Sequence, residues 1–193
     1  MAEVFVNLVT GAHLPDTGEI RVFGLPTSDI RDPSEWMSLL DRFGLVSERA
    51  VLMDEFTGEQ NVAMPLSLEI TDMAPDLRRQ VRRLAEEASL APDALAVPTG
   101  SLPPAARLRL RLARALALGP QVLLSEHPNA AIPPDEAAGF AADYSRIVTA
   151  RALASVVLTA DRTFAGAVAD DVLVLQPATG ELRSSGRGWR RWF

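Results

Sequence analysis

The sequence contains no cysteine and no lysine among its 193 residues. Without cysteine, disulfide bonds, catalytic thiolates and cysteine-ligated metal sites are excluded. All 19 basic residues are arginines, so Schiff-base chemistry and the lysine of a phosphate-binding loop are excluded as well. These absences remove several common classes of enzyme site before any motif is considered.

Long apolar runs are also missing, since none approaches the ~20 residues that a membrane-spanning helix needs. The nearest one, residues 112–124, is interrupted by Arg114 and Pro120. Residues 1–11 carry an acid and no basic group, which is a poor match to a signal peptide. The net charge of −6 gives no support to nucleic-acid binding. We therefore expect a cytoplasmic protein with no nucleic-acid partner, built as a single domain over residues 1–193.

The first third of the chain has mixed secondary-structure signals. Residues 2–10 fit either a strand or a buried helix. The alternation of apolar and polar residues over 19–24 predicts a strand there. A helix is expected over 32–44, with Asp32 as N-cap, Pro33 at the first position and Gly44 as the stop. A short strand is expected over 45–48.

The rest of the chain is predicted to form helices first and then alternating strands and helices. Helices are expected over 58–118, with apolar positions at Leu77, Val81, Leu84 and Ala88 on one face and a stop at Gly119. Beyond them, the order strand, helix, strand, helix, strand leads into a hairpin. Because the strands are apolar at consecutive positions, both of their faces should be buried. The sequence thus predicts an α/β fold with a parallel sheet.

Four segments carry a more specific pattern in their order and spacing. They are residues 7–24, residues 46–66 with Thr57 and Asn61, residues 101–132 with "ARAL" and "LLSEHP", and residues 155–182. Together they resemble the nucleotide-binding domain of ABC transporters. Residues 46–66 are similar to the Q-loop region of that family, and residues 101–132 to its signature motif and Walker B strand.

The resemblance implies a fold and a set of partners. It implies a P-loop NTPase-like core with a mostly parallel sheet flanked by helices, a helical subdomain inserted at about 62–112, and a C-terminal tail at about 184–193. The N-terminal part of the fold is expected to be missing. ATP and Mg²⁺ are the cofactors of the family. Its partners are a transmembrane permease subunit or a second nucleotide-binding domain, a homodimer included, at the inner face of the membrane.

Residues that carry chemistry in the family are replaced in this sequence. Glu48 aligns with the Q-loop glutamine, and Glu126 aligns with the Mg²⁺-binding Walker B aspartate. His127 stands where the catalytic glutamate would be, and it is our candidate catalytic residue. Pro133 and Ala160 replace the D-loop aspartate and the switch histidine. The signature sequence LSGGQ is replaced by Leu102, Pro103, Pro104, Ala105 and Ala106.

These replacements place Glu126 as the candidate metal ligand and Glu48 as the candidate cofactor contact. Carboxylate oxygens suit Mg²⁺, and a neutral imidazole can act as a base near pH 7. The alternative for Glu126 and His127 is a solvated strand end, and for Glu48 a surface carboxylate. The proline pair has no N–H to offer a phosphate. The phosphate-loop pattern G-x-x-x-x-G-K-[ST] is absent, either because the start is clipped or because the loop has been shed.

Three functional hypotheses follow. The first is an ABC ATP-binding-subunit-like protein with impaired or absent hydrolysis and a regulatory or structural role. The second is an N-terminally truncated active ATPase that works in a heterodimer. The third is a phosphate- or nucleic-acid-binding adaptor that uses the arginine stripe Arg107, Arg111 and Arg114, for which a solvated face paired with nearby acids is the alternative. The basic aromatic tail Trp189–Phe193 could add membrane or partner contact.

Overall fold

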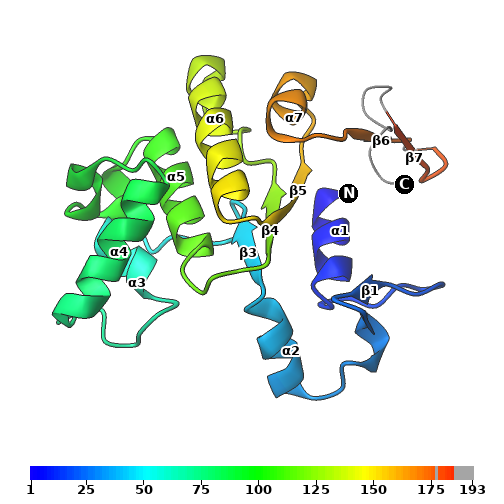
Figure 1. Cartoon of the computed structure of the whole chain (residues 1–193), viewed down its shortest axis with the longest axis horizontal. Coiled ribbons are helices and arrows are strands. Elements are labelled where there is room, and N and C mark those ends of the chain that lie inside the picture. Colours follow the sequence, from blue (N-terminus) through cyan, green and yellow to red (C-terminus); the bar gives the residue numbers. More distant parts are fainter. Residues whose placement is uncertain (177, 185–193) are drawn as a thin grey trace.

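A parallel sheet forms the centre of the fold, with strands in the order β3–β4–β5 (Figure 1). The structure is a computed structural model that describes residues 1–176 and 178–184. The three strands are β3 (Phe43–Val46), β4 (Val122–Glu126) and β5 (Ala154–Leu158). Both strand pairs are parallel. The predicted α/β fold with a parallel sheet is therefore confirmed.

The central strand β4 is buried on both faces, as its consecutive apolar residues predicted. Leu123 is 0% exposed and packs in the cluster that contains Leu112 and Phe140. Leu124 is 1% exposed and packs on the opposite face against Val6. Neighbouring strand residues point to opposite faces, so each leucine anchors one of the two layers that cover the sheet.

The chain begins with helix α1, which settles the open interpretation of residues 2–10 in favour of a helix. Val6 is the buried residue of this helix. The strand predicted over 19–24 is much shorter than expected, because only two residues of it pair. The bounds in this part of the chain are α1 (Ala2–Val9), β1 (Arg21–Val22), β2 (Leu25–Pro26), η1 (Thr27–Asp29) and α2 (Pro33–Leu40).

Helix α2 starts as predicted and ends earlier than predicted. Asp32 accepts a hydrogen bond from the backbone N–H of Ser34 at 2.7 Å, which makes it the N-cap. Gly44 was expected to stop this helix, and that is wrong, because the helix ends at Leu40 and Gly44 lies inside β3. A Cβ on Gly44 would lie 2.6 Å from the carbonyl oxygen of Ala115. The glycine therefore allows a close approach between β3 and α5.

Three helices from the middle of the chain pack together beside the sheet, in green and cyan at the left of Figure 1. Val81, Leu84 and Ala88, three of the predicted apolar positions, are buried. Helix α5 also contacts β3, which joins this helical region to the sheet. The bounds are α3 (Gly58–Ala63), α4 (Pro75–Glu87), η2 (Pro92–Leu95), η3 (Thr99–Ser101) and α5 (Pro104–Ala115).

The last part of the chain follows the predicted alternation of strands and helices. The burial predicted for both faces of every strand is wrong for β5 and β6, whose residues are half-buried or exposed, because β5 is at the edge of the parallel sheet and β6 lies outside it. Strand β6 pairs antiparallel with β7 to form a hairpin apart from the parallel sheet. The bounds are α6 (Pro134–Ala150), α7 (Arg162–Val168), β6 (Leu173–Leu175) and β7 (Leu182–Ser184). The tail predicted at about 184–193, including Trp189–Phe193, lies outside the described residues from position 185 onward.

Candidate functional site

The carboxyl ends of the three parallel strands meet at one edge of the sheet and gather most of the predicted site. Ser47, Glu48 and Arg49 follow β3, while Glu126 ends β4 and His127 follows it. In open α/β sheets this edge is where ligands bind. The contacts of the side chains at this edge therefore show whether the residues predicted for metal binding, cofactor binding and catalysis are brought together.

Glu126 is the most informative residue of the edge. Only 11% of its side chain is exposed, so it is not a solvated strand end. Its Oε2 accepts hydrogen bonds from Ser47 Oγ at 2.8 Å and from Arg49 Nε at 2.9 Å. Because a carboxylate oxygen has two lone pairs, these two donors occupy the hydrogen-bonding capacity of Oε2.

The pKa of Glu126 lies below the ordinary value for a glutamate. Burial alone would raise this pKa, but the hydrogen bonds from Ser47 and Arg49 and the positive charge of Arg49 outweigh burial. The carboxylate is thus ionised at neutral pH, and protein groups balance its charge.

Arg49 also connects this edge to helix α1. Its NH1 group lies 3.4 Å from Glu3 Oε1 and 3.4 Å from Asn7 Oδ1, and both acceptors belong to α1. The backbone N–H of Arg49 donates to Ser47 Oγ at 3.1 Å, which fixes the start of the loop. The sequence interpretation did not single out Ser47 or Arg49. The position of Arg49, directly after the predicted Q-loop residue, was the available signal.

Glu48 turns to the helical region instead of joining Glu126. Its two carboxylate oxygens accept from Arg111 of α5 at 2.7 and 3.0 Å. The side chain of Arg111 is 6% exposed, while that of Glu48 is 64% exposed. The two acidic residues predicted to face one cofactor are therefore held by two different arginines.

The arginine stripe of α5 holds the loop that follows β3. Arg107 pairs with Asp54 at 2.7 Å, and Arg114 donates to the carbonyl oxygens of Ala50 and Val51. The expected pairing with nearby acids is present, but the face is not simply solvated, because Arg111 is buried. These arginines are engaged within the chain, which argues against the adaptor hypothesis.

Asn61 and Thr57, which the sequence placed at the Q-loop offsets, both have structural partners. The Asn61 side chain is fully buried, accepts from the N–H of Met53 at 2.9 Å and donates to its carbonyl oxygen at 3.1 Å. Thr57 caps α3 by accepting from the N–H of Gln60, and the Gln60 side chain accepts in return from the N–H of Thr57. Together they fix the loop against α3.

His127 is exposed and has an unusual backbone. Its φ angle of +45° lies in the left-handed region, and its N–H donates to Leu158 O at 2.7 Å. Across residues 1–176 and 178–184, no side chain hydrogen-bonds the imidazole. A general base is normally oriented by a second group. His127 is therefore placed at the edge without a group that would orient it.

The segment at the signature position starts helix α5. Pro103 is the N-cap residue and Pro104 is the first helical residue. Neither has an N–H, so two of the donors that a helix start usually offers to an anion are absent. Ala105 is buried at 6% exposure. This helix start is poorly equipped to bind a phosphate group.

The end of β5 carries a polar cluster that the sequence interpretation missed. Asn129 donates to Asp161 Oδ2 at 2.9 Å and accepts from Thr159 Oγ1 at 3.1 Å. Asp161 also caps α7 through the N–H groups of Thr163 and Phe164. Ala160, at the switch-histidine position, is exposed between these residues. The cluster therefore joins the loop after β4 to the start of α7.

The side chains at the sheet edge do not fit the Mg²⁺ and ATP that the resemblance implies. Mg²⁺ requires oxygen ligands at about 2.0–2.1 Å in octahedral geometry, whereas Glu126 Oε2 faces a guanidinium and a hydroxyl. Within the described part of the chain, no group of three or more acidic or histidine side chains could hold a metal ion. Arg49 and Arg111 are both paired with carboxylates, so their positive charges are already balanced within the chain.

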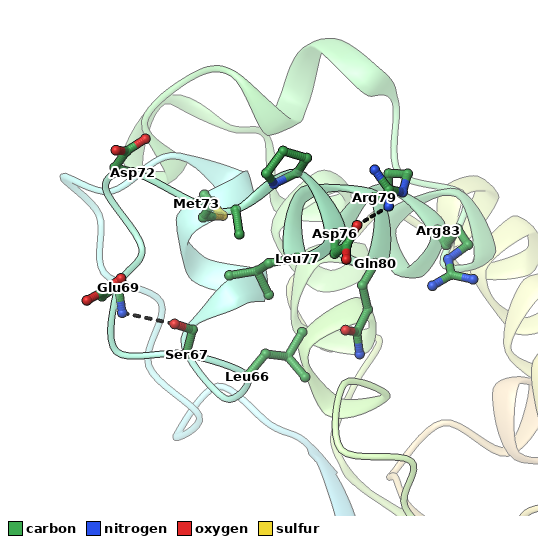
Figure 2. A pocket seen from close by; sticks show the side chains of 12 residues that line it. Leu66, Ser67, Glu69, Asp72, Met73, Asp76, Leu77, Arg79, Gln80 and Arg83 are labelled. Carbon is green, nitrogen blue, oxygen red and sulfur yellow. Dashed lines mark hydrogen bonds and ion pairs between the residues drawn. The ribbon is translucent and has the colours of Figure 1, made fainter.

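A separate open groove of about 790 Å³ lies between the loop after α3 and the first turns of α4 (Figure 2). Its apolar lining comes from Leu66, Met73, Ala74, Pro75 and Leu77. Asp76 and Arg79 form an ion pair along one side. Further polar lining comes from Ser67, Glu69, Asp72, Gln80 and Arg83. The groove lies in the helical region, away from the sheet edge.

Within residues 1–176 and 178–184, no helix combines the length and the apolar character that crossing a bilayer requires.

Comparisons with known proteins show that the chain is similar to ATP-binding proteins of ABC transporters. No family model matches the chain. It is 30% identical over 184 residues to the methionine import ATP-binding protein MetN of Rhizobium etli, which covers 95% of this chain and 50% of that protein. It is 29% identical to the MetN of Brucella abortus, over 96% of this chain and 49% of that protein. The chain spans about half the length of the curated relatives it matches.

Solved structures agree with the sequence relatives. The dimeric ATP-binding cassette MJ0796 bound to ADP and Pi matches with a TM-score of 0.76 at 21% identity, over 89% of this chain and 74% of that one. The cbiO1 protein of Clostridium perfringens, part of an ABC transporter complex, also matches with a TM-score of 0.76, at 18% identity and over 67% of its own length. The sheet, the flanking helices and the helical region are thus arranged as in ABC ATPase cassettes.

Proposed function

Because the chain is a relative of ABC transporter ATP-binding proteins and has the fold of ABC ATPase cassettes, we propose that it is an ATP-binding-subunit-like protein with impaired or absent ATP hydrolysis. In this proposal its role is regulatory or structural. It acts by associating with a transmembrane permease subunit or a second nucleotide-binding domain, at the inner face of the membrane.

The start of α5 is the observation that carries the proposal. In ABC cassettes, as the resemblance implies, this position presents backbone amides to the γ-phosphate across a dimer. Here Pro103 and Pro104 occupy it, and proline has no amide hydrogen to donate. Phosphoryl transfer depends largely on such positioning and charge stabilisation, and removing one donor of this kind typically costs about 10²–10³-fold in rate. We therefore expect the two missing donors to lower the rate of turnover strongly.

The helical region is the surface that we propose for partner binding. Leu68, which lies between the groove-lining residues Ser67 and Glu69, is 99% exposed, and Met64 at the end of α3 is 37% exposed. Val51 and Met53 are exposed on the neighbouring loop, which Asn61 fixes against α3. Exposed apolar side chains are thus present at the end of α3, on the loop after it and on the loop that it holds, and apolar surface of this kind is used where a partner binds. We propose that a cytoplasmic segment of a permease binds it.

A turnover and binding assay tests the loss of hydrolysis. The purified full chain is incubated with Mg²⁺ and ATP, and phosphate release is compared with that of a heat-inactivated sample. We expect equal rates, and no saturable fluorescence change on titration with a fluorescent ATP analogue. ATP turnover by the purified chain that disappears in His127→Ala would overturn the proposal.

Site-specific photocrosslinking tests the partner surface. A photoreactive amino acid replaces Leu68 in one variant and Leu25 in another, because Leu25 is 59% exposed outside the helical region. We expect the Leu68 variant alone to form an adduct that stays in the membrane after an alkaline carbonate wash, with a multi-spanning protein identified in it. Equal adducts at both positions, or none at Leu68, would contradict a docking role for this surface.

A further inference from the structure

Arg49 stands at a junction of three elements at the sheet edge. Its Nε donates to Glu126 at the end of β4, and its NH1 reaches Glu3 and Asn7 on α1. The residue itself belongs to the loop that leaves β3. One guanidinium therefore links the first helix of the chain to two strands of the central sheet.

The oxygen atoms around Arg49 resemble those of a cation-binding site, and the guanidinium of Arg49 takes the place of the cation. Two carboxylates, those of Glu126 and Glu3, lie within 2.9 and 3.4 Å of guanidinium nitrogens. Asn7 adds a neutral amide oxygen at 3.4 Å, and Ser47 Oγ donates to the same Glu126 oxygen as Arg49. Acidic and amide oxygens are the ligands that divalent cations prefer. In this chain those oxygens are turned toward a fixed guanidinium instead.

We infer that Arg49 replaces a divalent cation at this edge, so that its guanidinium supplies the positive charge that holds Glu126 and Glu3, and with them α1, against the sheet. A guanidinium carries one charge, cannot be removed by a chelator and stays protonated at any ordinary pH. The sheet edge should therefore keep its structure without metal. The inference concerns charge balance and the docking of α1, and it stands whether or not the chain binds the partner proposed above.

The inference predicts two responses in thermal unfolding of the full chain. Wild-type protein should unfold at the same temperature in excess Mg²⁺ and in EDTA. Arg49→Gln should unfold at a temperature lower by roughly 2–6 °C, because charge-assisted hydrogen bonds are lost from a partly exposed site. In this variant Mg²⁺ should restore part of the loss, because Glu126 and Glu3 then lack a cation. The exposed Arg31 gives the control, and Arg31→Gln should change neither temperature nor Mg²⁺ response.

Two further variants keep the test decisive even where Arg49→Gln does not fold. Arg49→Lys retains a charge but loses the fork that bridges α1 and β4, so it should unfold at a lower temperature with no gain from Mg²⁺. Glu126→Gln should leave the wild-type indifference to Mg²⁺ unchanged. A wild-type unfolding temperature that rises in Mg²⁺, with the rise lost in Glu126→Gln, would show that Glu126 binds the metal and would overturn the inference. A gain from Mg²⁺ in Arg49→Lys as large as the gain in Arg49→Gln would overturn it as well, because the retained charge should already balance Glu126 and Glu3. ATP turnover is not measured in this test, so its failure is distinguishable from failure of the proposed function.

Discussion

Arg111 and Glu48, which are 63 residues apart in the sequence, form a two-point ion pair with nitrogen–oxygen distances of 2.7 and 3.0 Å. The Arg111 side chain is 6% exposed and comes from α5, while the carboxylate comes from the loop after β3. The pair therefore joins the helical region to the edge of the sheet. It also commits the residue at the Q-loop position to a structural contact.

Replacing Glu48 should destabilise the fold. Glu48→Ala removes both acceptors of Arg111 and leaves a buried guanidinium without its counter-charge. Because 64% of the Glu48 side chain is exposed, solvent weakens the pair, and we expect a loss of about 1–2 kcal/mol in the free energy of unfolding. Urea unfolding followed by circular dichroism measures it. Glu55→Ala, at an exposed position of the same loop, is the control and should change stability by less than about 0.5 kcal/mol. Equal losses in the two variants would mean that the ion pair contributes nothing.

Tyr144 should make stability fall in alkaline solution. Burial raises the pKa of its phenol, and hydrogen bonds with Ser125 at 2.9 Å and Ser155 at 2.8 Å offset part of this effect. The unfolded chain therefore releases the phenolic proton from about pH 10 upward, while the folded chain retains it. Stability should fall as pH rises above that value, by up to about 1.4 kcal/mol per pH unit, until the folded phenol also ionises.

The amino-acid composition allows the ionisation of Tyr144 to be followed with little interference from other groups. Tyr144 is the only tyrosine, and the chain has neither lysine nor cysteine to titrate in the same range. Absorbance at 295 nm thus reports one phenol, and urea unfolding at a series of pH values reports the stability. Tyr144→Phe should abolish the alkaline decline. An unchanged decline in that variant would assign the effect to another group.

The capping box of α3 should contribute measurably to stability. Thr57 Oγ1 accepts from the N–H of Gln60 at 3.2 Å at the start of a helix of only 6 residues. Thr57→Ala should lower the free energy of unfolding by about 1 kcal/mol, because the amide loses its acceptor. Thr57→Ser retains the hydroxyl and should recover most of the loss. If the serine variant is as unstable as the alanine variant, the loss comes from packing of the threonine methyl group.

Replacing glycine by alanine should destabilise the fold at Gly44 and stabilise it at Gly166. A Cβ at Gly44 would lie 2.6 Å from the Ala115 carbonyl oxygen and 2.7 Å from Leu123 Cδ2, so β3 and α5 would have to separate. We expect Gly44→Ala to cost about 1–3 kcal/mol. Gly166 lies inside α7 with open space around it, and Gly166→Ala should stabilise by about 0.5–1 kcal/mol. Thermal unfolding compares them directly, and a stabilising Gly44→Ala would contradict the close contact.

Much of the architecture could be predicted from local pattern. Consecutive apolar residues in β4 predicted burial on both faces, and Leu123 and Leu124 are 0% and 1% exposed. The cap at Asp32 and the apolar face of α4 followed from side-chain chemistry and helical period. The end of α2 was predicted wrongly, because Gly44 is needed for contact with a helix about 70 residues later and not for a local turn.

The candidate site depended far more on contacts between distant residues. The identities of Glu48, Glu126 and His127, and the proline pair before α5, are properties of the sequence, and they predicted weakened phosphate chemistry. That Glu126 is held by Arg49, and Glu48 by Arg111, was decided only by the tertiary structure. Periodicity and capping act over a few residues along the chain, so they determine where strands and helices form. Ion pairs between residues more than 60 positions apart depend on how those elements pack, which no local pattern encodes.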